Sequence, residues 1–380
     1  MIPLRLAAVS AYISLCGFSG VYWGVSSNAL EPLYREYFNR STGRFTENGT
    51  FVAAPAEELE FLWSMVATVM CGVPALCTMC MSPIVRRLGK RDTFVLATGP
   101  CNLIAAVCFY VGVHHRLLTF FFVSRVFAGF TYAFTAVVAP FLAEVSPPEH
   151  RDQVMIVESI VMFLTIICST VVNMPQIGVC EANWFWTAAL FPIVAGIISI
   201  LMHWLVPQSP KFCYLGQGDE TSAEVSFRFY HGTQANWLTM KKHMDAEAEI
   251  AQEGVGLLRI LRSPQMRWPL VLACCCELTT VAAGAPVLNA YSSGMMQQLG
   301  ISVDTSVLLT LLLLQVPSAL CATFVSLPLV QLVGKRRLYL CSLFISFACW
   351  VTLGVAEAVQ SGWLLVAVVF VMLIVYSGGE

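Results

Sequence analysis

The chain alternates between long apolar stretches that carry almost no charge and short polar segments that hold most of the charged residues. Ten apolar stretches lie near residues 5–30, 60–84, 93–113, 117–143, 153–173, 183–206, 268–294, 303–330, 338–357 and 361–377. A helix crosses a bilayer with about 20 apolar residues, so the pattern predicts about ten transmembrane helices. The first stretch follows Arg5 and is longer than the core of a secretory signal peptide, which indicates a first helix rather than a cleaved leader.

Composition leads to the same class of protein. Apolar residues make up 57% of the 380 residues and charged residues only 12%, with a mean hydropathy of +0.73. Soluble proteins carry about twice that share of charge, so too few polar groups remain to cover a water-exposed surface. We therefore expect an all-α integral membrane protein whose surroundings are the lipid bilayer. The 21 basic and 23 acidic residues nearly cancel, which gives no field that favours nucleic acid as a partner.

Residues typical of catalysis or metal binding are scattered rather than grouped. Most of the 15 cysteines lie inside apolar stretches, where a thiol behaves as a small hydrophobic group. Cys77 and Cys80 have the spacing of a metal or redox pair but no second pair nearby, and His114-His115 has no partner set. Without a nucleophile motif, zinc spacing or phosphate loop, we expect neither an enzyme nor a bound metal or cofactor.

The distribution of Lys and Arg predicts the orientation in the membrane. With the N-terminus in the cytoplasm, sixteen of these residues fall in cytoplasmic segments and four outside, as the positive-inside rule requires. Two glycosylation sequons, at Asn39 and Asn48, lie in the segment after the first stretch, which this topology places outside. We predict a multi-pass protein of the plasma membrane, glycosylated at these two asparagines.

The sequence also divides into two similar halves. A basic turn containing glycine recurs after the second stretch of each half, at residues 87–91 and 333–337. We predict an N-terminal six-helix half over residues 1–206, a cytoplasmic helical linker over 207–267 and a C-terminal half over 268–380. Repeated halves of this kind are typical of secondary transporters.

Several motifs occur in one order along the chain. They are Leu62-Trp63-Ser64, Arg125-Val126-Phe127-Ala128-Gly129, Glu144-Val145-Ser146-Pro147 with Arg151, Pro207-Gln208-Ser209-Pro210-Lys211-Phe212, Gly232-Thr233 and Arg262-Ser263-Pro264. In this order they resemble the sugar porter family of the major facilitator superfamily, especially its facilitative glucose-transporter branch. The resemblance implies the major facilitator fold, two six-helix halves that move solute by alternating access.

The family has twelve transmembrane helices, whereas this sequence ends near the tenth. The resemblance therefore implies a C-terminal half represented by helices 7–10. A fragment, an incomplete gene model and a truncated isoform would each produce such a sequence.

The resemblance implies a network of charges at the cytoplasmic face that controls gating. Its members in this sequence are Arg87, Lys90, Arg91, Arg125, Glu144, Arg151, Lys335 and Arg336. We expect Glu144 to pair with Arg151, Lys335 or Arg336. Acidic positions of the family carry Gln208 and Gln331 here, which predicts a weaker inner gate. For Arg125 two interpretations stay open: a structural or conformational role, or a side chain that extends to the outer interface.

The resemblance places a solute site between the halves, near the middle of the membrane. The expected substrate-binding residues are Ser159, Glu277, Thr280, Val281, Asn289 and Tyr291. At the first four of these positions the family's glutamines are replaced or shifted, so the resemblance leaves the identity of the solute open.

Two carboxylates lie within predicted spans, Glu158 and Glu277. A charge at the bilayer centre costs about 2.5–3.5 kcal/mol on insertion scales, so such residues usually face a cavity or a partner. They could pair with a cation, bind a proton, accept a hydroxyl or only order the bundle.

The predicted function is facilitative transport of a small polar solute, with a hexose or related sugar as the first candidate. Residues 17–28 hold no acid, where proton-coupled members of the family tend to have an Asp, and this favours facilitated diffusion. Two alternatives remain: a non-transporting sensor or truncated regulatory member, and a transporter of a polyol, urate or an organic cation.

Overall fold

The computed structural model describes most of the chain. The described residues are 4–45, 51–177, 179–232, 235–252, 262–282 and 332–358, with 302, 305, 315–320, 367–368 and 371. Two compact units divide the chain: Met1–Ser209 with Ala290–Ala319, and Pro210–Asn289 with Leu320–Glu380. The division into halves and linker that the sequence suggests stays a prediction.

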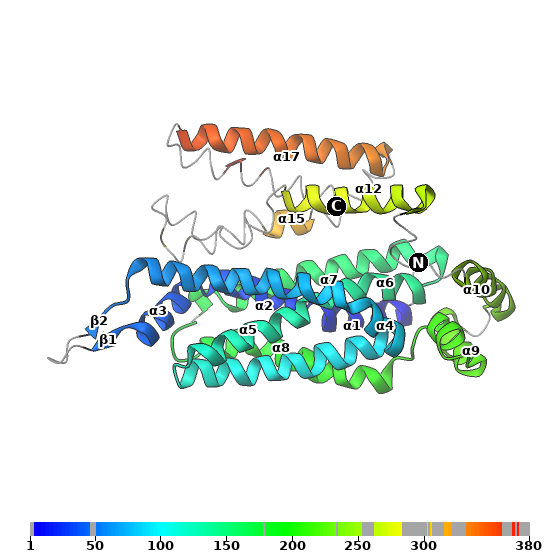
Figure 1. The fold of residues 1–380 in the computed structure, drawn as a ribbon, viewed down its shortest axis with the longest axis horizontal. Helices are drawn as coiled ribbons and strands as arrows, with labels where there is room; N and C mark the ends of the chain where they lie inside the picture. The colour runs from blue at the N-terminus through cyan, green and yellow to red at the C-terminus, as the bar shows by residue number, and fades with distance from the viewer. Residues whose placement is uncertain are drawn as a thin grey trace. The chain divides into compact units, whose positions relative to one another are not determined.

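The first predicted span is a bent pair of helices (Figure 1). Helix α1 (Leu4–Gly17) and helix α2 (Ser19–Ala29) meet at an angle of 51°. Helix α3 (Glu31–Thr42) follows, with proline in its first turn, where a missing backbone N–H costs nothing. Beyond it, the short strands β1 (Arg44–Phe45) and β2 (Phe51–Val52) pair antiparallel.

Helix α4 (Ala56–His114) covers the second and third predicted spans without a loop between them. Its 59 residues are enough for two crossings, and its helical geometry breaks at Gly89, where φ is 78° and ψ is 163°. Only glycine adopts this conformation without strain. The break therefore turns the chain within the basic motif that the sequence singled out.

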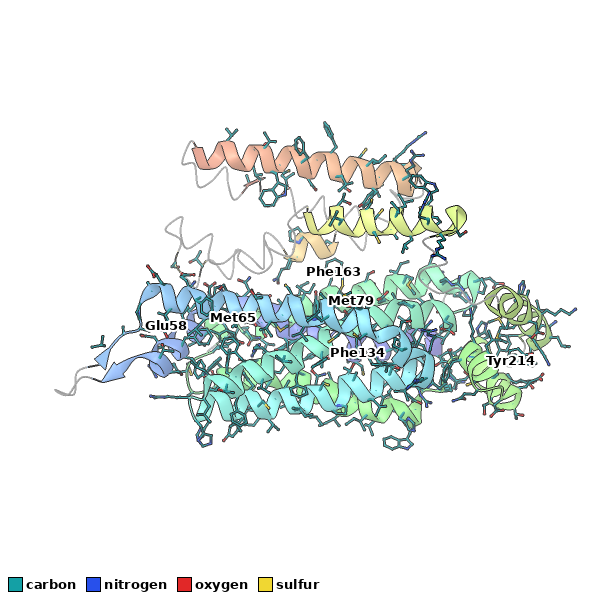
Figure 2. All side chains as sticks on the ribbon, in the orientation of Figure 1. Glu58, Met65, Met79, Phe134, Phe163 and Tyr214 are labelled. Atoms are coloured by element: carbon teal, nitrogen blue, oxygen red, sulfur yellow. The ribbon has the colours of Figure 1, made fainter. Side chains whose placement is uncertain are left out.

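Further helices complete the first unit. They are α5 (Leu118–Ala133), α6 (Thr135–Val145), η1 (Pro148–His150), α7 (Arg151–Val172), η2 (Pro175–Ile177) and α8 (Trp184–Leu205). Among the described residues, four helical segments are long and apolar enough to span a membrane, and the bent α1–α2 pair makes a fifth. Large apolar side chains are exposed on these helices, such as Met79 at 81% exposed, and they suit contact with lipid (Figure 2).

Glycines bring these helices close together. A Cβ on Gly129 of α5 would lie 2.9 Å from Cβ of Val73 on α4, and one on Gly99 of α4 would lie 3.2 Å from the carbonyl oxygen of Gly196 on α8. Small residues allow helix backbones to approach in membranes, where apolar packing replaces the hydrophobic effect as the main attraction. Gly129 therefore lets α5 pack closely against α4.

The second unit begins with the segment after the sixth span. It holds η3 (Phe212–Gly216), α9 (Glu220–His231), α10 (Trp237–Gln252), α12 (Pro264–Ala282) and α17 (Lys335–Ala358). The short helix α15 (Val316–Leu320) crosses the boundary between the units. The Asp219 side chain caps α9 by accepting from the Ser222 hydroxyl at 2.6 Å and from the Ser222 backbone N–H at 3.0 Å, and these hydrogen bonds lower the pKa of Asp219.

Side chains join α10 to both α9 and η3. Lys241 donates to Glu220 at 2.6 Å, and the Tyr214 hydroxyl donates to Asp245 at 2.7 Å. Of the four spans predicted after residue 267, α12 covers the start of the first and α17 covers the third. Most of the remaining two lies outside the described residues.

Candidate functional site

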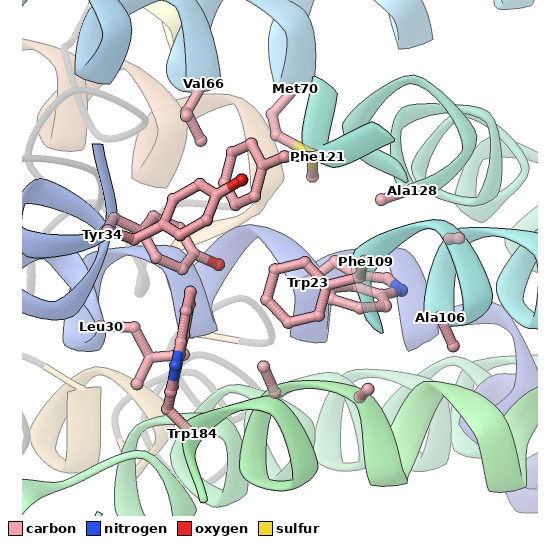
Figure 3. Close-up of a cluster of buried hydrophobic side chains, with 14 of the residues drawn as sticks. Trp23, Leu30, Tyr34, Val66, Met70, Ala106, Phe109, Phe121, Ala128 and Trp184 are labelled. Atoms are coloured by element: carbon pink, nitrogen blue, oxygen red, sulfur yellow. The ribbon is translucent and has the colours of Figure 1, made fainter. Parts of the chain in front are cut away.

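The first unit holds a cluster of buried aromatic side chains, and Figure 3 shows Trp23, Tyr34, Phe109 and Phe121 among them. The Arg125 side chain on α5 is fully buried, and these four rings surround its guanidinium carbon. The distances from Cζ to the ring centroids are 4.7 Å for Phe109, 4.9 Å for Trp23, 5.2 Å for Phe121 and 5.3 Å for Tyr34. A cation over aromatic faces at this range is stabilised by the ring quadrupoles.

Hydrogen bonding of Arg125 is incomplete. Nη1 donates to the Ser27 hydroxyl at 3.3 Å, while Nε and Nη2 meet no hydrogen-bond acceptor among the described residues. Nor does any described carboxylate form an ion pair with it. Of the two interpretations of Arg125, extension to the interface does not agree with a fully buried side chain. The site therefore holds a desolvated charge in an aromatic setting, and no ion pair with a described residue offsets the cost of its burial.

Polar side chains link the helices around this cluster. Trp23 Nε1 donates to Asn102 Oδ1 at 3.3 Å, and Asn102 Nδ2 donates to the Ser19 hydroxyl at 2.8 Å. Asn102 lies on α4 and the other two on α2, so this chain of bonds fixes the first span against the third. On the other side of α2, Ser169 of α7 donates to the Tyr22 carbonyl at 3.1 Å.

A second set of polar contacts lies next to the Gly89 break in α4. Lys90 forms an ion pair with Glu144 of α6 and also donates to the Pro140 carbonyl at 3.2 Å. The second carboxylate oxygen of Glu144 accepts from the Ser209 hydroxyl at 2.8 Å. One carboxylate thus joins the break in α4, the end of α6 and the segment that follows α8.

The neighbouring segment strengthens this connection. Arg91 Nη1 donates to the Val206 carbonyl at 3.0 Å, and Gln208 Nε2 donates to the Leu88 carbonyl at 3.0 Å. Arg91 also pairs with Asp92 at 2.8 Å. Arg91 of the basic turn therefore binds the Val206 carbonyl after α8, and Gln208 binds the Leu88 carbonyl in the turn.

The structure brings only part of the predicted charge network together. Among the described residues the partner of Glu144 is Lys90, whereas Arg87, Arg151 and Arg336 have exposed side chains and form no ion pair. Lys335 begins α17, and its side chain lies outside the described residues. Arg125 belongs to the aromatic cluster instead. Within the first unit Glu144 pairs with Lys90 rather than with Arg151, and its expected pairing with Lys335 or Arg336 stays a prediction.

One predicted solute-site residue, Ser159, and one of the two carboxylates in predicted spans, Glu158, lie on α7. The Ser159 hydroxyl donates to the Met155 carbonyl one turn earlier, at 3.1 Å, so its hydrogen is used within the helix. The half-buried Glu158 carboxylate meets no hydrogen-bond donor or cation in the part of the chain that the structure describes. A carboxylate in this position is suited to bind a proton, a cation or a hydroxyl.

The other predicted members of the site belong to the second half. Glu277, Thr280 and Val281 lie near the C-terminal end of α12, and their side chains are outside the described residues. Asn289 and Tyr291 lie outside the described residues entirely. Their roles in solute binding stay predictions.

The described residues hold no group of three or more side chains that could bind a metal ion. Of the two predicted glycosylation sites, Asn48 is outside the described residues. Asn39 lies in α3, and its Oδ1 accepts the Ala54 backbone N–H at 2.9 Å.

Comparison with known proteins identifies the family. The model of the sugar (and other) transporter family matches residues 6–379. Facilitated glucose transporter member 3 of solute carrier family 2 is 23% identical in Gallus gallus, over 93% of this chain and 70% of that protein. The Homo sapiens member 3 is also 23% identical, over 83% of this chain and 62% of that protein. The chain thus spans about two thirds of the length of these relatives.

Solved structures of low identity agree on the fold. The xylose transporter XylE from E. coli, in a partially occluded inward-open conformation, matches 99% of this chain and 84% of that chain, with a TM-score of 0.72 and 15% identity. XylE bound to 6-bromo-6-deoxy-D-glucose matches 97% of this chain and 78% of that chain, with a TM-score of 0.73. The predicted major facilitator fold is confirmed.

Proposed function

Because this chain belongs to the sugar (and other) transporter family, we propose that it carries a small polar solute, first of all a hexose or related sugar, across a membrane by alternating access. The match of the family model over residues 6–379 carries the proposal. Chemistry of the described residues agrees with it, since the first unit holds uncharged hydrogen-bonding groups and aromatic rings, the groups that suit sugar recognition.

The plasma membrane, with the N-terminus in the cytoplasm, is the location that we propose. Under this topology the Lys90–Glu144 pair faces the cytoplasm and the β1–β2 hairpin faces outside. Alternating access requires the cytoplasmic ends of the helices to separate and close again. We propose that the contacts around Glu144 hold the ends of the first unit together as one moving body.

Transport down the gradient, without proton coupling, is the mechanism that we propose. Residues 17–28 carry no acid, and the only cation of α5, Arg125, is surrounded by rings rather than by a carboxylate. Glu158 and Glu277 are the remaining candidates for a coupling site in predicted spans.

The test is counterflow in proteoliposomes. Vesicles preloaded with unlabelled D-glucose and containing the purified chain should accumulate external labelled D-glucose, whereas protein-free vesicles should not. Uptake is expected to be independent of external pH between 5.5 and 7.5, and Glu158→Gln and Glu277→Gln are expected to leave that independence unchanged. Accumulation that rises at acid pH and is abolished by Glu277→Gln would contradict facilitated diffusion.

A sensor or regulatory member is the second candidate, and one observation favours it. The hydroxyl of Ser159, at the position of a family glutamine, donates within its own helix and offers less to a sugar than an amide would. A sensor would bind D-glucose, raising the melting temperature, without any counterflow. Competition of flux by polyols, urate and organic cations distinguishes these solutes from a sugar.

A further inference from the structure

A pocket separate from the Lys90–Glu144 group opens at the opposite end of the first unit. It lies among α3, the end of α4 and the start of α8, with a volume of about 370 Å³. Its walls include Glu36, Arg40, Tyr110, Arg116, Glu181 and Trp186. Small-molecule sites typically measure about 300–1,000 Å³ and combine apolar walls with a few polar groups, and this pocket has both features.

One wall of the pocket carries excess negative charge. Arg40 donates to both carboxylate oxygens of Glu181, at 2.6 and 2.8 Å, and to Glu36 at 2.5 Å. Two carboxylates therefore share one guanidinium, which leaves about one negative charge on this wall.

A positive group lies on the same pocket. Arg116, in the turn after α4, is exposed and forms no ion pair with any described residue. Its backbone has a φ of 56°, a conformation uncommon for residues other than glycine and asparagine. The pocket thus presents separate negative and positive groups, as a zwitterionic ligand requires.

The aromatic walls relate the pocket to the membrane. Trp186 is 56% exposed and Tyr110 is 46% exposed, and both lie at helix ends. In membrane proteins, tryptophan and tyrosine are enriched at the level of the bilayer where the hydrocarbon core meets the headgroups. Along the same two helices, towards the middle of the membrane, exposed apolar side chains follow: Val107 and Ile104 on α4, and Leu190, Val194 and Ile197 on α8.

We propose that this pocket binds the headgroup of a zwitterionic phospholipid of the phosphatidylcholine class. The quaternary ammonium lies against Trp186 and the Glu36–Glu181 wall, the phosphate pairs with Arg116, and the acyl chains follow the apolar faces of α4 and α8. Aromatic rings beside carboxylates attract quaternary ammonium groups, and arginine pairs with phosphate. A bound lipid would join α3, α4 and α8, and this does not depend on which solute is carried.

Native mass spectrometry of the purified full chain tests the proposal. After delipidation, dioleoylphosphatidylcholine or dioleoylphosphatidylglycerol is added at equal concentrations. We expect one phosphatidylcholine to be retained, with about tenfold preference over phosphatidylglycerol. Trp186→Ala should reduce retention by about the same factor, whereas Trp186→Phe, which keeps a ring, should preserve most of it.

Two further variants control for folding and for location. Arg116→Asn removes the charge but tolerates the positive φ, so it should fold normally and weaken phosphatidylcholine retention. Trp204→Ala removes another exposed tryptophan, at the far end of α8, and should leave retention unchanged. Equal losses in Trp186→Ala and Trp204→Ala, or equal retention of both lipids, would overturn the proposal in favour of unspecific lipid contact. Displacement of the lipid by D-glucose would overturn it in favour of a saccharide site.

Discussion

Lys90 pairs with Glu144, and this one contact connects the only left-handed residue of α4, Gly89, to the end of α6. Ser209 donates to the other carboxylate oxygen of Glu144, so the segment after α8 joins the same group. Three positions distant in sequence are therefore fixed through one acidic side chain. In an alternating-access transporter such a group would keep these ends of the helices in the first unit moving together.

Removing either partner of this pair should destabilise the first unit. The exposed fractions are 27% for the Lys90 side chain and 14% for Glu144, so each partner is mostly desolvated. We expect Lys90→Met or Glu144→Gln to lower the free energy of unfolding by about 1–3 kcal/mol, because the remaining group loses its partner. The double variant should cost less than the sum of the two, since both partners are then gone.

Thermal unfolding in detergent, read by intrinsic fluorescence, measures these effects. Arg87→Met provides the matched control, because Arg87 belongs to the same basic turn but is exposed and forms no ion pair with described residues. Its effect should stay within about 0.5 kcal/mol. Strictly additive losses for Lys90 and Glu144 would show that the two groups do not interact.

Close packing between α2 and α5 predicts a severe effect at Gly20. A Cβ at this position would overlap the backbone of Tyr132, which cannot move without displacing α5. We expect Gly20→Ala to destabilise the protein by at least about 1–3 kcal/mol, the usual cost of overpacking. Gly72→Ala is the control, because a Cβ there meets nothing within 4 Å.

In the control, alanine removes conformational freedom from the unfolded chain and should be neutral or stabilising by up to about 1 kcal/mol. Melting temperatures of both variants in the same detergent provide the comparison. A similar loss at the two positions would mean that helix propensity, rather than contact between α2 and α5, decides the outcome.

Sequence patterns predicted the helical fold well because lipid imposes simple rules on composition and length. The spans near 117–143, 153–173 and 183–206 correspond closely to α5–α6, α7 and α8. The bend of 51° after Gly17 was not predicted, since apolar periodicity does not record where a helix changes direction. Nor did the sequence show that the second and third spans join through Gly89 without a loop.

The site was harder to predict than the fold. Arg125 was recognised from its motif, but the rings that surround it come from α2, α3, α4 and α5, and only tertiary structure brings them together. Tyr34 and Phe121 are unremarkable members of aromatic-rich segments in the sequence. The sequence did not show that Glu144 pairs with Lys90 rather than with Arg151, because charge alone does not distinguish the two basic residues.

Arg125 should contribute to movement more than to stability. The desolvation of the buried Arg125 guanidinium destabilises the folded protein, because no described carboxylate offsets it. Arg125→Met should therefore leave the free energy of unfolding unchanged or raise it by about 1–4 kcal/mol. Counterflow by this variant should fall, because the cation that orders the four rings is lost. Arg125→Lys should destabilise the protein, since an ammonium cannot reproduce a planar guanidinium stacked among aromatic rings.

Melting temperature and counterflow measured on the same preparations distinguish the two roles. Normal counterflow in a stable Arg125→Met protein would assign the cluster to packing alone. A strong loss of stability in Arg125→Met would instead mean that the rings stabilise the charge by more than its desolvation costs.

The Glu220–Lys241 pair predicts that α9 and α10 associate most strongly at pH values between the pKa of Glu220 and the pKa of Lys241. The hydrogen bond from Lys241 lowers the pKa of Glu220, and the same bond raises the pKa of Lys241. A lowered acid pKa contributes stability above the ordinary value of 4.5, and this contribution is lost as the pH falls through the lower folded value. The raised lysine pKa contributes below the ordinary value of 10.5 and is lost as the pH rises through the higher one.

Hydrogen exchange of residues 237–252, corrected for the intrinsic effect of pH, measures this association. We expect protection of α10 to be higher at pH 7 than at an acid pH below the lowered pKa of Glu220, because protonated Glu220 no longer attracts Lys241. Lys241→Gln should reduce the difference between the two pH values, while Lys242→Gln, at the exposed neighbouring position, should preserve it. An unchanged difference in Lys241→Gln would assign the acid sensitivity to another group, such as Asp219 at the N-cap of α9, whose pKa is also lowered.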